Sequence, residues 1–157
     1  MMLELHNITI GQQIHGLSAT VSEGNVLSIT GSQGKGKTTL LRALLGFVAT
    51  EEGHISIDGE LLTPLSAPYF RRQTAYVPQR LEVPDGYEDV PTDYMRLLEH
   101  GVHSGKALLI IDEPAEPLSD DDNARRERLI SEAAARGATV VAVNTRVTQN
   151  QVDAKRL

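Results

Sequence analysis

The chain has 157 residues, of which 40% are hydrophobic and 23% charged, values that are ordinary for a globular domain and exclude a disordered or fibrous protein. Its formal net charge of −6 argues against nucleic acid or anionic lipid as a partner. Cysteine is absent, which excludes disulfides, thiolate metal sites and cysteine nucleophiles.

The first third of the chain carries strand and helix patterns in alternation. We expect strands at 3–10, 17–21 and 26–30, a helix from about 36 to 45, and an alternating segment at 54–59. Gly46 suits the C-terminal cap of the helix, and Asp58-Gly59 is a residue pair typical of hairpin turns. These signals place a strand directly before, and a helix directly after, a glycine-rich segment.

The remainder of the chain continues the alternation. We expect a strand at 74–77, a loop at 81–91, a helix from Thr92 to about Val102, a strand at 107–111, a helix from Ser119 to Gly137 and a strand at 139–143. Two Asp–Arg pairs at i,i+4 spacing, 121–125 and 122–126, predict a solvated face on the last helix. The order of elements predicts an α/β layered fold with a parallel core sheet.

The glycine-rich segment fits the spacing of a phosphate-binding loop, a glycine followed by four residues and then Gly-Lys-Thr. Polyphosphate is best held by several amide N–H groups at a helix N-terminus, and glycine lets the backbone approach it closely. Lys37 can reach the β- and γ-phosphates, and the Thr38 hydroxyl can ligate Mg²⁺. The alternative is a glycine-rich turn with incidental lysines. The candidate nucleotide-binding residues are Gly31, Ser32, Gln33, Gly34, Lys35, Gly36, Lys37, Thr38 and Thr39.

Two acids follow the apolar strand at 107–111. Ligands of open α/β sheets bind at the carboxyl ends of the strands, where Asp112 and Glu113 would emerge. Asp112 suits a Mg²⁺ ligand, and Glu113 suits a general base that activates water. Gln79 follows the strand at 74–77, and its amide could bridge the metal or its water to the γ-phosphate. The alternatives without a catalytic role are a polar strand end for Asp112 and Glu113, and an exposed loop glutamine for Gln79.

Three segments together resemble the ATP-binding cassette (ABC) ATPase family: 31–39 as Walker A, 75–79 as the Q-loop and 108–114 as Walker B with its glutamate. The resemblance implies a three-layer P-loop NTPase fold with a parallel core sheet and a small antiparallel β subdomain. It also implies binding of ATP and Mg²⁺, hydrolysis by an activated water, and a dimer that encloses two nucleotides. In its terms, Glu113, Gln79 and Lys37 are catalytic, and Thr38, Gln79 and Asp112 hold the metal.

The chain also departs from the family pattern. Only about 32 residues lie between Gln79 and Asp112, roughly half or less of the usual spacing, and the signature position falls at 88–92, which does not match. Asn144-Thr145 stands where the family has a switch histidine, and Ile10 and Gly11 stand where it has an adenine-stacking aromatic residue. These departures predict weak recognition of the nucleotide base and an incomplete catalytic site for ATP hydrolysis between two subunits.

We therefore expect one ABC-type nucleotide-binding domain over 1–157, with its helical subdomain largely missing, that hydrolyses ATP slowly. A non-hydrolysing regulatory module, a degenerate phosphate-binding remnant and a small-molecule kinase are the alternatives. A second copy or another protein is the expected partner, whereas the missing subdomain argues against a membrane permease. No leader or long apolar run is visible, so we expect a cytoplasmic protein without a membrane-inserted segment.

Overall fold

The computed structural model describes residues 1–31, 36–80, 93–144 and 153–156. Its elements, in chain order, are β1 (Leu3–Ile10), β2 (Ile14–Val21), β3 (Val26–Thr30), α1 (Lys37–Leu44), β4 (Glu52–Ile57), β5 (Glu60–Leu61), α2 (Ala67–Arg72), β6 (Thr74–Val77), α3 (Tyr94–Val102), β7 (Leu108–Ile111), α4 (Asp120–Ala135), β8 (Thr139–Val143) and β9 (Asp153–Arg156).

The core of the fold is a parallel sheet with strand order β6-β7-β8-β3-β9. Every residue of β3, β7 and β8 is buried, as expected for strands that are covered on both faces. Successive side chains of a strand point to opposite faces, so Leu108 and Ile110 join one hydrophobic core while Leu109 and Ile111 join another. The predicted parallel core sheet is confirmed, and β9 extends it beyond the strands that we expected.

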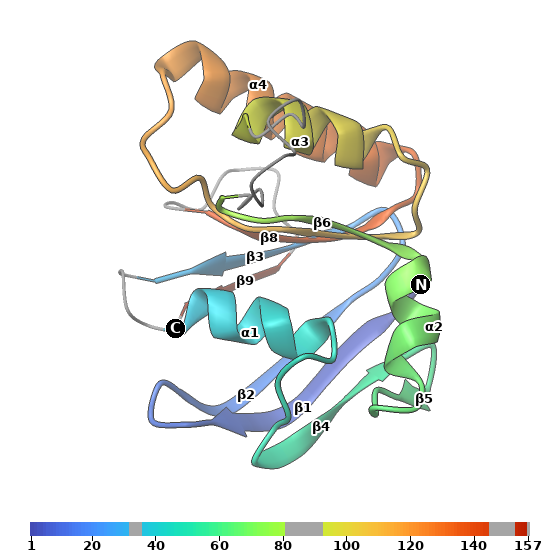
Figure 1. Cartoon of the computed structure of the whole chain (residues 1–157). Coiled ribbons are helices and arrows are strands. Elements are labelled where there is room, and N and C mark those ends of the chain that lie inside the picture. Colours follow the sequence, from blue (N-terminus) through green and yellow to red (C-terminus); the bar gives the residue numbers. More distant parts are fainter. Residues whose placement is uncertain (32–35, 81–92, 145–152, 157) are drawn as a thin grey trace, which may run out of the picture.

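The two hydrophobic cores separate three layers. Helices α3 and α4 cover one face of the parallel sheet, and α1 lies between its other face and a second sheet (Figure 1). Leu40, Leu41 and Leu44 of α1 are almost fully buried there. The three-layer α/β fold is therefore confirmed.

The second sheet is antiparallel, with strand order β2-β1-β4-β5. Strand β2 begins at Ile14, three residues before the start that the sequence pattern predicted. Ile57 pairs with Glu60, so Asp58 and Gly59, with φ of 52° and 80°, form the two-residue hairpin turn that the sequence predicted. The small antiparallel unit is confirmed, and it lies beside the strand that leads into the glycine-rich loop.

The helix ends follow local capping chemistry. The Ser119 hydroxyl accepts a hydrogen bond from the backbone N–H of Asp122 at 3.1 Å, as predicted for the start of α4. At α3 the prediction was wrong, because Asp93 is the cap and its carboxylate accepts from the Arg96 N–H at 3.2 Å. Thr92, the residue we expected to cap this helix, lies outside the described residues.

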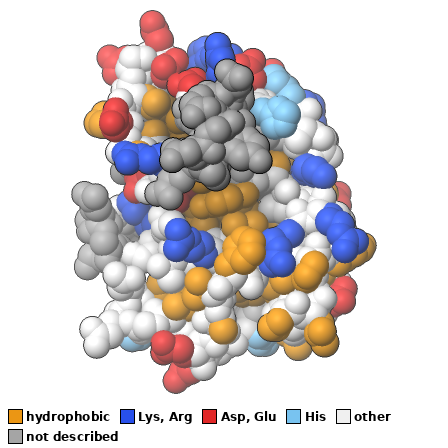
Figure 2. Space-filling view, viewed as in Figure 1, with side chains coloured by type: hydrophobic (Ala, Val, Ile, Leu, Met, Phe, Trp, Pro, Cys, Tyr) orange, Lys and Arg blue, Asp and Glu red, His pale blue; other side chains and the backbone are white. Residues whose placement is uncertain are grey.

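Helix α2 was not predicted from the sequence. Phe70 anchors it in the core, whereas Tyr69 is exposed. The Arg71 guanidinium donates to the Leu45 carbonyl at 2.8 Å and lies 4.5 Å from the centroid of the Phe47 ring, so it joins α2 to the end of α1. Figure 2 shows hydrophobic side chains interspersed with Lys and Arg on this face of the molecule. Arg71 therefore has structural partners at and just beyond the end of α1.

Candidate functional site

A cavity of about 730 Å³ opens where four parallel strands end. Gly31 follows β3, Gln79 follows β6 and Glu113 follows β7, and all three line the cavity together with Val143 at the end of β8. The carboxyl ends of the strands are where open α/β sheets bind ligands, and the volume lies within the range of small-molecule sites.

The N-terminus of α1 forms one wall of this cavity. Gly36 is the N-cap, with φ of 83° and ψ of 17°, a left-handed conformation that glycine adopts without strain. Lys37, Thr38 and Thr39 of the first turn line the cavity. The helix therefore directs its free N–H groups and the positive end of its dipole toward the space where an anion would bind. Four residues of the predicted loop, Ser32, Gln33, Gly34 and Lys35, lie outside the described residues.

Asp112 lies next to the cavity and contacts Thr38, which lines it. It has no exposed surface, one carboxylate oxygen accepts from the Thr38 hydroxyl at 3.0 Å, and the other accepts from the Glu113 N–H at 2.8 Å. Burial raises the pKa of the Asp112 carboxyl, and the neighbouring Glu113 charge acts in the same direction. The two hydrogen bonds and the Lys37 ammonium partly offset this increase in pKa.

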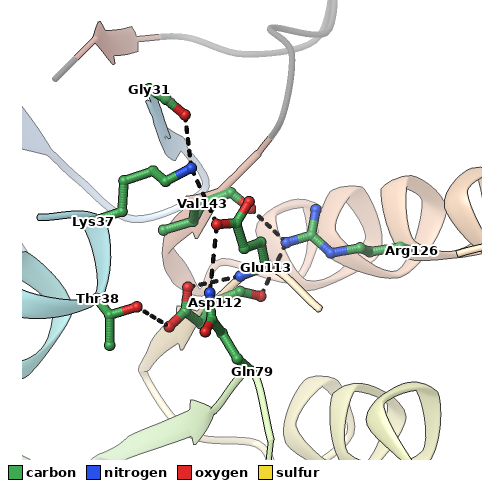
Figure 3. Close-up of polar contacts among 8 residues, drawn as sticks. All are labelled: Gly31, Lys37, Thr38, Gln79, Asp112, Glu113, Arg126 and Val143. Carbon is green, nitrogen blue, oxygen red and sulfur yellow. Dashed lines mark hydrogen bonds and ion pairs between the residues drawn. The ribbon is translucent and has the colours of Figure 1, made fainter. Parts of the chain in front are cut away.

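Lys37 lies between the glycine-rich segment and the acids (Figure 3). Its ammonium donates to the Gly31 carbonyl at 2.7 Å and forms an ion pair with the Glu113 carboxylate at 3.1 Å. The Gln79 amide donates to the same Glu113 oxygen at 3.4 Å. The candidate base is thus held by the residue expected to bind phosphate.

The structure thus brings the described members of the predicted site together. Gly31, Gly36, Lys37, Thr38, Thr39, Gln79 and Glu113 line the cavity, and Asp112 lies beneath them. Asn123 and Arg126 of α4 also line it, and sequence reasoning missed both.

The interpretation of Arg126 as a solvated, Asp122-paired residue was wrong. Arg126 is only 6% exposed, and its guanidinium donates to the Tyr94 hydroxyl at 2.9 Å and to the Val143 carbonyl at 2.7 Å. Arg125 pairs with Glu99 of α3 at 2.8 Å instead of with Asp121. A periodicity signal was nevertheless present, since position 126 shares its helix face with the buried Leu129, Ile130 and Ala133.

The residue that follows β8 is also committed to contacts inside the fold. The Asn144 amide donates to the Ser28 hydroxyl at 2.7 Å and accepts from Arg126. Thr145, which stands at the position of the family's switch histidine, lies outside the described residues.

The oxygen atoms of Thr38 and Asp112 next to the cavity fit a Mg²⁺ ion. A hydroxyl and a carboxylate, Thr38 and Asp112, lie 3.0 Å apart and supply the oxygen ligands that this hard cation prefers. Within the described ranges no cluster of three or more His, Asp or Glu side chains could hold a metal alone. Mg²⁺ is usually held by one or two protein oxygens together with substrate phosphates and water, so two protein oxygens beside a cavity of about 730 Å³ are an arrangement that suits it.

The sequence profile of the ABC transporter family matches residues 14–93. The manganese transport system ATP-binding protein MntB of Listeria innocua is 39% identical over 70 residues, which are 45% of this chain and 27% of that protein. The ABC multidrug transporter lscH of Purpureocillium lilacinum is 35% identical over 89 residues, 54% of this chain and 6% of that protein. The chain therefore spans well under half the length of these relatives.

Among solved structures, a putative ABC transporter ATP-binding protein from Pyrococcus furiosus superposes with a TM-score of 0.79 at 16% identity. The match covers 100% of this chain and 98% of that chain. At this identity the likeness shows a shared fold. Over the part of the chain that the structure describes, no helix is both long and apolar enough to cross a membrane.

Proposed function

This chain belongs to the ABC transporter family, as an ATP-binding domain, and from that premise we propose that its cavity binds Mg²⁺-ATP and hydrolyses it slowly to ADP and phosphate. One observation carries the proposal. The Thr38 hydroxyl of α1 and the carboxylate of Asp112, which directly follows β7, meet at 3.0 Å, although 74 positions separate them in the sequence. This contact unites the phosphate-binding helix and the acidic strand end at one cavity.

Phosphate binding rests on the N-terminus of α1 and on Lys37. The backbone N–H groups at the start of α1 would contact the phosphates, and the predicted binding residues Ser32, Gln33, Gly34 and Lys35 lie outside the described residues. Lys37 would exchange its contacts with Gly31 and Glu113 for contacts with the β- and γ-phosphates. Thr38 and Asp112 would hold Mg²⁺, which supplies positive charge to the phosphate oxygens.

Hydrolysis would use the two polar side chains at the rim. Glu113, released by Lys37, would accept a proton from a water whose oxygen forms a bond to the γ-phosphorus, and Gln79 would orient that water. The bond from the γ-phosphorus to the bridging oxygen would break and leave ADP. The Gln79 amide already lies 3.4 Å from the Glu113 carboxylate, which supports a shared role.

Slow turnover follows from the donors that this chain lacks. Asn144-Thr145 stands where the family has its switch histidine, and the Asn144 amide is bound to Ser28 and Arg126. Loss of one such donor to a transition state typically lowers a rate by ~10²–10³.

Calorimetric titration with ATP, with Mg²⁺ or with EDTA, together with phosphate release, tests the proposal. We expect ATP binding that Mg²⁺ strengthens, and loss of binding in Lys37→Ala. Lys106→Ala is the matched control, because Lys106 is an exposed lysine that donates to the Arg72 carbonyl. Unchanged affinity in Lys37→Ala, or no stabilisation by millimolar ATP with Mg²⁺, would overturn the proposal and favour a phosphate-binding remnant.

A non-hydrolysing nucleotide-binding module is the second candidate. The observation that favours it is the engagement of Asn144 with Ser28, which keeps that amide away from the phosphate site. Single-turnover hydrolysis separates the two functions. Equal rates for the unmodified chain and Glu113→Gln would support the module, whereas a rate lowered at least tenfold by Glu113→Gln would support the enzyme.

A further inference from the structure

Arg126 occupies an unusual position for a charged residue. It projects from the middle of α4 toward the ends of β7 and β8, where its guanidinium lies beside Glu113 (Figure 3). One terminal nitrogen donates to two backbone carbonyls, those of Asp112 at 3.3 Å and Val143 at 2.7 Å. The other terminal nitrogen donates to the Asn144 side chain, and Nε donates to the Tyr94 hydroxyl at 2.9 Å.

All four acceptors are neutral oxygens. Among the described side chains, no carboxylate forms an ion pair with Arg126, although only 6% of this residue is exposed. A buried charge without a counterion is costly, and apolar packing would hold α4 against the sheet without that cost. The geometry therefore calls for a role that apolar packing cannot fulfil.

The contacts tie together the strand ends that carry the site. The Asp112 carbonyl receives hydrogen bonds from both Arg126 and the Tyr94 hydroxyl, so the peptide between Asp112 and Glu113 is held from behind. On its other side, the same strand end presents the Asp112 carboxylate to Thr38. Arg126 thus spans β7 and β8 at the point where the orientation of this peptide determines the direction of both acids.

Building on the proposed function, we propose that Arg126 is a positioning residue that clamps the ends of β7 and β8 and thereby holds Asp112 in place for Mg²⁺-nucleotide. Its effect passes through the backbone, since its four contacts can occupy four of the five N–H groups of a guanidinium. A planar fork is required for this bridging, which an ammonium group cannot reproduce.

The test compares Arg126→Met and Arg126→Lys with Arg125→Met in the full chain. Arg125 is the matched control, because it is the neighbouring arginine on α4 and pairs with Glu99 on the surface of the helix layer. The measured quantity is the ratio of ATP affinity in Mg²⁺ to ATP affinity in EDTA. We expect both Arg126 variants to lower this ratio by roughly 10–100-fold, as loss of a residue supporting a metal ligand typically does. Affinity in EDTA should stay within about threefold, since the phosphate loop is untouched.

A role limited to stability would lower the melting temperature and leave the ratio unchanged, and that result would overturn the proposal. A ratio fully retained in Arg126→Lys would equally overturn it, because charge alone would then suffice. If the unmodified chain bound no ATP, the proposed function would fail separately.

Amide NMR of the ligand-free chain tests the clamp independently of nucleotide. We expect the Glu113 and Asn144 amide resonances to shift in Arg126→Met and in the milder Tyr94→Phe, but not in Arg125→Met. Unshifted Glu113 and Asn144 amides in a folded Arg126→Met chain would refute the clamp whatever the nucleotide result.

Discussion

Replacement of Glu113 by Gln should tighten nucleotide binding while it removes the proposed base. The Lys37 ammonium forms an ion pair with the Glu113 carboxylate at 3.1 Å. A nucleotide must break this pair before Lys37 can contact phosphate, so the ion pair competes with the ligand. The substituted glutamine would preserve the shape of the side chain but remove its charge, and Lys37 would be released at lower cost.

The magnitude follows from distance and exposure. Two unit charges 3.1 Å apart attract each other by about 5 kcal/mol at an effective dielectric constant of ~20. Lys37 is 7% exposed and Glu113 18% exposed, so the pair lies between an exposed pair, worth at most ~1 kcal/mol, and a fully buried one. A net competition of about 1–2 kcal/mol corresponds to nucleotide binding that is roughly 5–30-fold tighter.

Calorimetric titrations of ATP and ADP in EDTA measure this gain without turnover. Repulsion between Glu113 and the γ-phosphate would affect ATP alone, whereas release of Lys37 should improve both ligands. Glu116→Gln removes an equal charge from an exposed position on the cavity lining and should leave ADP affinity unchanged. ADP affinity that Glu113→Gln leaves unaltered would refute competition by the ion pair.

Two further predictions concern stability. Asp112→Asn should raise the melting temperature of the ligand-free chain near neutral pH, because burial raises the pKa of Asp112 and the fold disfavours its charged form. Stability of the unmodified chain is lost as pH rises from the ordinary carboxyl range through the raised pKa, so the advantage of Asn should grow across that window; an advantage that is independent of pH would contradict this cause. Gly53→Ala should cost about 2–5 kcal/mol by denaturant unfolding, because φ is 77° and a Cβ would lie 2.2 Å from the His6 carbonyl oxygen. Gly59→Ala, with φ of 80° and nothing within 4 Å, should cost only about 1–2 kcal/mol, and equal losses would count against the backbone clash.

The predictable parts of this fold are those whose signal is local. Strands β7 and β8 could be predicted because each is a short run of mostly apolar residues in the sequence. Ser119 could be predicted as a helix cap because its hydroxyl needs only the nearby Asp122 N–H. The location of the candidate site could also be predicted, because the ends of neighbouring parallel strands meet at one edge of the sheet. This arrangement brings Asp112 to the first turn of α1.

The elements that were missed lack such a signal or depend on distant contacts. Helix α2 has only six residues, and β9 is a short polar segment that becomes a strand only by pairing with β3. Arg126 shows how tertiary context overrides a local rule. The i,i+4 spacing to Asp122 predicted a surface pair, but the Tyr94 hydroxyl and the carbonyls at the ends of β7 and β8 offer this guanidinium several well-placed acceptors.

The two positively charged side chains at this site, Lys37 and Arg126, differ in whether a ligand can replace their contacts. Lys37 holds Gly31 and Glu113 through a single ammonium on a flexible stem, so a phosphate can replace both contacts without moving the backbone. Arg126 is bound through three nitrogens to groups at the ends of two strands and on a helix, and its release would remove one donor from each of the buried Asp112 and Val143 carbonyls. We therefore expect nucleotide binding to change the side-chain contacts on the side of Asp112 that faces the cavity, while the Asp112 backbone keeps its position. That asymmetry would keep the proposed metal site in place while Lys37 exchanges its contacts with Gly31 and Glu113 for contacts with phosphate.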